Sequence, residues 1–187
     1  STSTSMNSAK ALELAHADKY LFFDDDDYYP PRYVEEFDKL LIAGHNEMIG
    51  NMRWIDYRLS TGYYRIRLKI QKQIEIGDTL SEWHGSGIVG EKLKQEMIKV
   101  LKEHPKERYN DCLCFRYIFS KGKYPCITID FGDWSGISLK DYGVGNKGLI
   151  QSHFSNDGMS RDDNYEFFKT HLGDDWKRYE KYLGRLR

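Results

Sequence analysis

The stretch Tyr63-Tyr64-Arg65-Ile66-Arg67-Leu68-Lys69-Ile70-Gln71 decides the fold class of this chain. Its apolar side chains alternate with cationic and polar ones at a period of two, which indicates a β-strand with one buried face. Ser60-Thr61-Gly62 before it has the composition of a turn, so we expect an earlier strand at 52–59 to join it. We interpret the arginine and lysine side chains as a solvated face. Contact with an anion or a nucleic acid is the alternative.

Outside this hairpin, the chain carries a second alternating pattern and several helical ones. Apolar residues alternate over 111–119 and again over 127–131, and Lys121-Gly122-Lys123 between them predicts the turn of a second hairpin. Helical spacing of apolar residues predicts helices at about 8–21, 31–44, 89–102, 162–172 and 174–186.

The order of these elements predicts an α+β fold: an antiparallel sheet of about four or five strands, with helices at the N-terminus, the centre and the C-terminus. Residues 1–7 begin with a Ser/Thr run and are expected to be a disordered lead or a cloning scar, whereas 8–187 should form a single α+β domain. The glycine-rich segment 132–164 has little periodicity. We expect a long loop there, held in place by aromatic residues such as Trp134 and Tyr142 or used for recognition.

Charge is segregated along the sequence although the total is close to zero. Residues 1–50 hold ten Asp or Glu against four Lys or Arg, and residues 51–125 hold nine against fifteen. The net charges of these two blocks are therefore −6 and +6, and the whole chain carries −1. Opposed charged surfaces orient and select partners, so this pattern favours an interaction function without naming the partner.

The acidic run Asp24-Asp25-Asp26-Asp27 and the tyrosines after it are the main candidate contact surface. Four consecutive carboxylates cannot all face one ion in regular structure, and the central glycine of a calcium loop is missing, so we predict no metal site. A solvated loop is the alternative. Because tyrosine and tryptophan are favoured at interfaces, we assign partner binding to eight residues. They are Asp24, Asp25, Asp26, Asp27, Tyr28, Tyr29, Trp134 and Tyr142.

The string Trp83-His84-Gly85-Ser86-Gly87 resembles the nicotinamide-anchoring strand of ADP-ribosyltransferases of the poly(ADP-ribose) polymerase type. The resemblance implies that the backbone of His84 and Gly85 would hold NAD. A turn histidine between a strand and a helix is the alternative. That family also has a tyrosine near a glycine-rich turn and a later acidic residue. Tyr142-Gly143 and the acidic residues after it could be given these roles, but their spacing does not by itself indicate them. We therefore predict no catalytic residue and no cofactor.

Three cysteines, Cys112, Cys114 and Cys126, do not form a recognisable metal or redox pattern. Their number is odd, and one residue rather than two separates the first pair, unlike zinc ribbons and redox motifs. In the predicted strand 111–119, Cys112 and Cys114 would share one face, so we expect them to be small buried apolar groups.

Aromatic residues make up 14% of the chain, no apolar run reaches the length of a membrane span, and the charge is polarised. In composition the chain is similar to bacterial immunity proteins and other toxin inhibitors. We therefore predict a cytoplasmic, non-catalytic protein that inhibits or sequesters a partner protein, such as a basic toxin or nuclease, without a membrane partner. The alternatives are a nucleic-acid-associated protein that uses the basic block, and an ADP-ribosyltransferase-like enzyme with His84 in its nicotinamide site.

Overall fold

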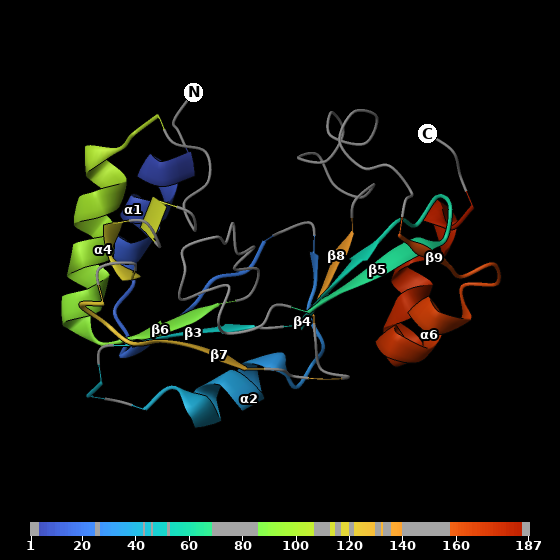
Figure 1. The fold of residues 1–187 in the computed structure, drawn as a ribbon, viewed down its shortest axis with the longest axis horizontal. Helices are drawn as coiled ribbons and strands as arrows, with labels where there is room; N and C mark the ends of the chain where they lie inside the picture. The colour runs from blue at the N-terminus through green and yellow to red at the C-terminus, as the bar shows by residue number, and fades with distance from the viewer. Residues whose placement is uncertain are drawn as a thin grey trace. The chain divides into compact units, whose positions relative to one another are not determined.

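The computed structural model confirms an α+β fold, with the strands in two mixed sheets of four and five strands (Figure 1). Two compact units divide the chain: unit 1 is Ser1–Phe22, Val34–Met52 and Lys69–Ile129, and unit 2 is Phe23–Tyr33, Arg53–Leu68 and Asp130–Arg187. The single domain expected over 8–187 stays a prediction. The structure describes residues 4–24, 27–42, 44–45, 47–51, 53–68, 86–106, 113–114, 117–119, 122–129, 132, 136–139 and 158–184.

Unit 1 contains sheet A, whose strand order is β1-β6-β3-β7. The neighbouring strands are antiparallel except for β3 and β7, which run parallel. The elements are α1 (Thr4–Leu14), β1 (Lys19–Leu21), α2 (Tyr33–Leu40), β3 (Glu47–Asn51), β6 (Gly87–Val89), α4 (Glu91–Glu103) and β7 (Cys126–Ile129). In sequence, α1 precedes the strands of this unit, and α2 and α4 lie between them.

Apolar side chains cover both faces of sheet A. Tyr20, Ile88 and Met48 lie directly opposite one another on β1, β6 and β3, and they join the core formed with helices α1 and α4. On the other face, a Cβ added to Gly87 would lie 2.9 Å from a methyl carbon of Leu41 and 3.0 Å from the ring of Phe37. The glycine therefore lets α2 and the segment after it approach the sheet closely.

Unit 2 contains sheet B, whose strand order is β2-β8-β4-β5-β9. The pair β4 and β8 is parallel, and the other neighbours are antiparallel. The hairpin expected from the alternating stretch is therefore confirmed as β4 and β5. The elements are β2 (Asp27–Tyr28), β4 (Arg53–Tyr57), β5 (Tyr63–Leu68), β8 (Ile137–Leu139), β9 (Ser160–Arg161), α6 (Glu166–Leu172) and the 3-10 helix η4 (Gly173–Tyr182).

The apolar face of sheet B forms the core of unit 2. Ile137, Ile55 and Ile66 lie directly opposite one another on β8, β4 and β5. The first two are buried, whereas Ile66 is 44% exposed, so the end of this apolar row reaches the surface. Phe168 and Leu172 of α6 are buried against the same cluster, and the amphipathic spacing of this helix therefore predicted its inner side correctly.

Asp162 supplies hydrogen-bond acceptors at the start of α6. Its carboxylate accepts hydrogen bonds from the backbone N–H groups of Phe167 and Phe168, at 3.2 and 3.0 Å, and from the hydroxyl of Tyr57 at 2.7 Å. This buried acid thus satisfies donors at the helix start that have no partner within the helix.

The hairpin expected at 111–119 and 127–131 is wrong. Leu113 and Cys114 are helical, and the N–H of Ile118 donates to the carbonyl of Cys114 at 2.9 Å. Leu113, Cys114 and Ile118 are buried together in the core of unit 1. Cys114 and Ile118 are four residues apart, which is the spacing of one face of a helix. Strand β7 does form, but it pairs in parallel with β3.

Two other sequence predictions also need correction. The helix expected over 8–21 begins at Thr4 and ends at Leu14, and Lys19–Leu21 forms strand β1 instead. The segment 132–164, expected as a loop, contains β8, a buried inner strand of sheet B. Three residues are too few to display a period in the sequence, which is why this strand was missed.

Candidate protein-binding site

An exposed aromatic ring, supported by other rings, lies beside the acidic run. Phe23 is 46% exposed, and its ring packs edge-on against Tyr29 with the centroids 4.4 Å apart. Tyr29 in turn contacts Tyr33 and Trp54, at centroid distances of 5.2 and 5.8 Å. We call Phe23, Asp24, Asp27 and Tyr29 the Phe23 patch.

Tyr29 also holds the backbone of Asp24 in place through a hydrogen bond. The backbone N–H of Asp24 donates a hydrogen bond to the Tyr29 hydroxyl at 3.0 Å. Burial raises the pKa of Tyr29 above its ordinary range, so the hydroxyl stays protonated at neutral pH. Asp24 is exposed and Asp27 is half-buried at the first position of β2. Asp24 is therefore attached to a support of packed aromatic rings.

Tyr28 was predicted to bind a partner, but its side chain is buried. It is 6% exposed within the core of unit 2, and its hydroxyl donates to a carboxylate oxygen of Asp175 at 3.3 Å. Burial, followed by the charge of Asp175, raises the pKa of Tyr28 to about 12. Tyr28 thus anchors β2 in the core and offers a partner little surface.

The other face of sheet B carries a row of polar residues across four strands. Asp27 of β2 lies opposite Ser138 of β8, which lies opposite Asp56 of β4, which lies opposite Arg65 of β5. Ser138 and Asp56 are buried. We call these four residues the polar row. The register thus places residues of the acidic run and of the basic strand on one sheet face, which the sequence alone did not show.

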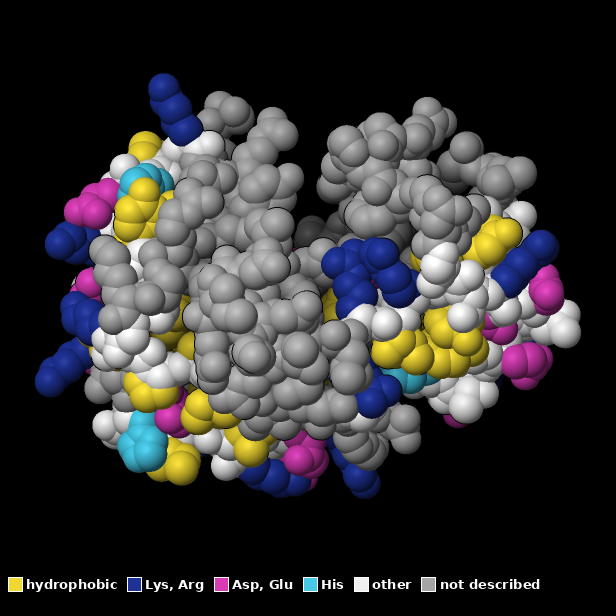
Figure 2. Space-filling view, viewed as in Figure 1, with side chains coloured by type: hydrophobic (Ala, Val, Ile, Leu, Met, Phe, Trp, Pro, Cys, Tyr) yellow, Lys and Arg dark blue, Asp and Glu magenta, His cyan; other side chains and the backbone are white. Residues whose placement is uncertain are grey.

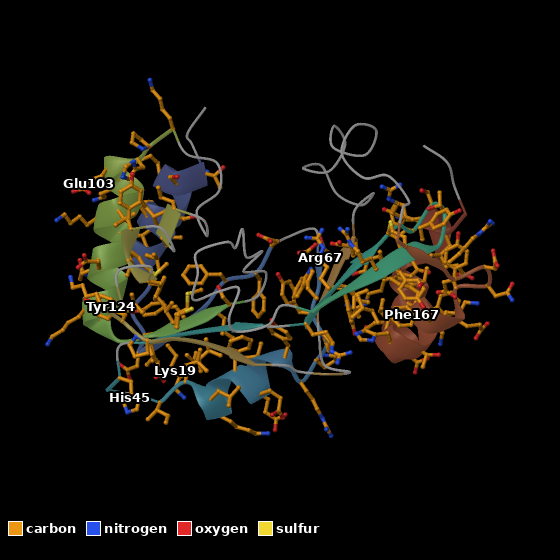
Figure 3. All side chains as sticks on the ribbon, viewed as in Figure 1. Lys19, His45, Arg67, Glu103, Tyr124 and Phe167 are labelled. Atoms are coloured by element: carbon orange, nitrogen blue, oxygen red, sulfur yellow. The ribbon has the colours of Figure 1, made fainter. Side chains whose placement is uncertain are left out.

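Two arginines converge on the carboxylate of Asp56. Arg65 donates to Oδ2 of Asp56 from Nη2 at 2.9 Å and from Nε at 3.3 Å, and Nε of Arg67 donates to the same oxygen. The Asp56 side chain is 2% exposed, compared with 37% for Arg65 and 18% for Arg67. Arg67 lies by β4 and β5 (Figure 3), where Figure 2 shows a cluster of Lys and Arg side chains. The face is therefore not the simple solvated face that the sequence suggested.

Trp54, which lies opposite Arg67, is packed against a glycine. A Cβ added to Gly136 would lie 2.2 Å from the Trp54 ring, so only glycine leaves room for the indole. Sequence reasoning missed Phe23, Trp54 and Asp56 as candidate site residues. Phe23 had a usable signal, since it immediately precedes the acidic run.

The lysines of α4 pair with acidic groups inside unit 1. Lys102 forms an ion pair with Glu13 of α1, and Lys99 lies 4.0 Å from Glu103. The charge of this helix is therefore partly balanced by nearby acidic side chains.

Lys94 borders a surface pocket of unit 1. Its amino group donates to the carbonyl of Ala15 at 2.9 Å and lies 5.1 Å from the centre of the Tyr20 ring. Contact with Tyr20 raises the pKa of Lys94, so the amine is held protonated and is a poor nucleophile. Glu13, Asp18 and Glu91 also line the pocket, which makes its rim acidic.

Several predicted residues lie outside the described part of the chain. Among the residues that the structure describes, no group of three or more His, Cys, Asp and Glu side chains could hold a metal ion. Cys114 is buried, and burial raises the pKa of Cys126 to about 12, which makes its thiol unreactive at neutral pH. The predicted residues outside the described ranges are Asp25, Asp26, Lys69, His84, Cys112, Trp134 and Tyr142.

Comparison with known proteins gives this chain no relative: no family model matches it, and neither a curated protein nor a solved structure is significantly similar. Within the described ranges, every helix is too short or too polar to cross a lipid bilayer. The geometry of the Phe23 patch and the polar row therefore carries the functional argument.

Proposed function

We propose that this protein is a non-catalytic binding protein that inhibits or sequesters a partner protein through the Phe23 patch. The observation that carries the proposal is the exposure of Phe23 on a support of packed aromatic rings. A large ring that remains 46% exposed in the free protein has apolar area that a partner can cover. In its acidic surroundings and mode of action, such a protein is of the immunity-protein or toxin-inhibitor type.

The arrangement has the features of an interface hot spot. Aromatic residues dominate the binding energy of many interfaces when they insert into a pocket of the partner. Phe23 already packs against Tyr29, and the Asp24 backbone is held by the Tyr29 hydroxyl. Binding would therefore lose little conformational entropy, since the patch is ordered before the partner arrives.

The charges of the patch favour a basic partner. Asp24 is exposed directly beside Phe23, and Asp27 follows at the start of β2. Carboxylates around an apolar anchor accelerate association with a positively charged surface and discriminate against acidic proteins. A basic toxin or nuclease is the kind of partner that this surface fits. Inhibition would follow from covering its active site.

The alternatives have weaker support. A nucleic-acid binder needs cationic groups that follow a phosphate backbone. Here Arg65 and Arg67 share Asp56, and Lys102 pairs with Glu13. The ADP-ribosyltransferase alternative rests on His84, which lies outside the described residues.

The test uses the immobilised chain to retain proteins from a lysate of its native cell. Wild type, Phe23→Ala and Leu14→Ala are compared by quantitative mass spectrometry. Leu14 is a matched control because it is also an apolar residue, 64% exposed, but lies on α1 of unit 1. We expect a basic protein that wild type and Leu14→Ala retain and that Phe23→Ala loses.

The retained protein is then purified and its activity is titrated with the chain. We expect the activity to fall to zero at a defined stoichiometry with wild type, and to require at least tenfold more Phe23→Ala. A partner that remains fully active when saturated would contradict inhibition. Equal retention by all three forms would contradict the role of the Phe23 patch.

A further inference from the structure

Strand β5 of sheet B has an open edge at Ile66. On one side β4 pairs with the whole strand, whereas on the other side β9 pairs only with Tyr63 and Tyr64 (Figure 1). Continuing this register would place Gly158 opposite Ile66, but Gly158 lies in a turn with a φ of 71°. In the part of the chain that the structure describes, β5 beyond Tyr64 therefore has no neighbouring strand on this side.

The backbone of Ile66 directs its hydrogen-bonding groups toward this open side. The N–H of Arg58 donates to the carbonyl of Tyr63 at 2.9 Å, so these two residues form a hydrogen-bonded pair of the antiparallel ladder. Such pairs alternate, so the backbone groups of Arg65 and Arg67 face β4 and those of Ile66 point outward. Within the described ranges, neither the N–H nor the C=O of Ile66 has a hydrogen-bond partner.

The same residue also offers apolar surface. The Ile66 side chain is 44% exposed, and Tyr64, two residues earlier on the same face of β5, is half-buried. The Tyr64 ring stacks on the ring of Phe167 in α6, with the centroids 4.2 Å apart. An extended chain laid along this edge would therefore find hydrogen-bonding groups and an apolar surface for alternate side chains.

We propose that the open edge of β5 binds an extended segment of another protein as an added strand. The backbone of this segment bonds to the N–H and C=O of Ile66, and every second side chain is apolar and packs beside Ile66 and Tyr64. Unpaired strand edges are the sites at which such strand addition occurs. The proposal uses no residue of the Phe23 patch and does not rest on the proposed function.

A second copy of this chain fits the edge less well. Symmetric pairing centred on Ile66 needs the outward backbone groups of Tyr64, which already face β9. Symmetric pairing centred on Arg67 would set two arginines directly opposite each other, which is unfavourable. The extended segment therefore belongs to a different protein.

Two measurements test the proposal, and the first uses the free chain. Hydrogen–deuterium exchange by NMR compares the amide of Ile66 with those of Arg65 and Arg67. We expect the Ile66 N–H to exchange at least tenfold faster, because the other two N–H groups face β4. Exchange at Ile66 as slow as at both neighbours would show that the edge is already covered and would overturn the proposal.

The second measurement selects ligands for the immobilised full chain from a random nine-residue peptide display library. The variants are Ile66→Thr and the control Ile127→Thr, each checked for native circular dichroism. Ile127 is a matched control because it is a strand isoleucine, 41% exposed, whose backbone groups face β3 in the parallel ladder. Threonine keeps the β-branched shape, so neither substitution should disturb its strand.

We expect the selected peptides to share apolar residues at alternate positions and to slow the exchange of the Ile66 N–H. Their affinity should fall at least fivefold with Ile66→Thr and stay within twofold of wild type with Ile127→Thr and with Phe23→Ala. N-methylation of the peptide amide that bonds to the Ile66 carbonyl should abolish binding. N-methylation of the next amide, which points away from β5, should have little effect.

Three results would overturn the proposal. The first is a selection that yields no peptide dependent on Ile66. The second is a peptide whose binding tolerates N-methylation at every position, since no added strand would then form. The third is a wild-type dimer in sedimentation analysis that Ile66→Thr converts to a monomer, which would assign the edge to a second copy.

Discussion

Sheet A and sheet B differ in what their two faces carry. Both faces of sheet A pack against helices through mainly apolar side chains, α1 and α4 on one face and α2 on the other, while Lys19 and Glu47 lie opposite Val89 on the two neighbouring strands. Sheet B has an apolar face that joins the core of unit 2 and an opposite face with the polar row. Charged groups at buried positions weaken a fold unless they are well paired. The contrast suggests that sheet A serves mainly as scaffold and that unit 2 carries the recognition chemistry.

The largest effect should come from the core of sheet A. Ile88→Ala removes a fully buried side chain between α1, α4 and the sheet, so we expect it to lower the free energy of unfolding by about 4 kcal/mol. Urea denaturation followed by circular dichroism measures this loss. A cost below about 1 kcal/mol would show that sheet A is not the tightly packed scaffold described.

Asp56→Asn tests the polar face of sheet B in the same assay. Replacing the carboxylate removes an ion-pair partner from Arg67, which is largely buried, so we expect a loss of about 3 kcal/mol. Arg65 is partly solvated, so its lost ion pair should contribute less to this change in the free energy of unfolding. The control Asp38→Asn breaks the exposed pair with Lys19 and should change stability by less than about 1 kcal/mol. Equal effects of the two substitutions would contradict the assigned role of Asp56.

The sequence predicted the strands of sheet B at β4 and β5 better than it predicted which other strands pair with them. The alternation around Ile66 correctly indicated β5, and the turn at 60–62 correctly joined it to β4. The burial of Asp56 was not predictable in the same way, because it depends on the strands on both sides of β4. Register between strands distant in sequence, such as β8 and β4, leaves no local signature.

The Phe23 patch shows the same limit. The acidic run and Tyr29 were visible in the sequence as contact candidates, yet the role of Tyr29 as a support depends on its contacts with Phe23 and Trp54. The misassigned segment at 113–119 had apolar residues that satisfy both helical and alternating patterns. Burial in the core of unit 1 decided between them, and this is a tertiary effect.

Alkaline pH should lower the stability of both units, because each buries a group that loses its proton at high pH: the thiol of Cys126 in unit 1 and the hydroxyl of Tyr28 in unit 2. Burial raises the pKa of Cys126 in β7 from about 9 to about 12, and that of Tyr28 in β2 from about 10 to about 12. The folded state keeps these protons longer than the unfolded state does, so their contribution is intact below pH 9 and is lost as the pH rises toward 12.

Unfolding free energies at a series of pH values check this. Cys126→Ala should reduce the slope from about pH 9 upward, and Tyr28→Phe should reduce it only above about pH 10. The second effect should be the smaller one, because burial raises the pKa of Tyr28 by less than it raises the pKa of Cys126. Identical pH profiles for wild type and both variants would be inconsistent with the assigned burial.

The smallest effect on stability should come from Asp24→Asn. The side chain is exposed, so the free energy of unfolding should change by less than about 0.5 kcal/mol. Association with the retained partner should nevertheless slow about twofold to threefold at low salt, because one steering charge is lost. Stopped-flow association rates over a salt series measure this. A rate that does not change at low salt would separate the acidic run from recognition.

The most direct test of the central claim is hydrogen–deuterium exchange of the chain, free and bound to the partner retained in the capture experiment. If unit 2 carries recognition through the Phe23 patch, peptides that cover Phe22–Pro30 should gain protection on binding. Peptides of α4 in unit 1 should exchange at the same rate in both states. Protection confined to α4, with exchange around Phe23 unchanged, would contradict the account.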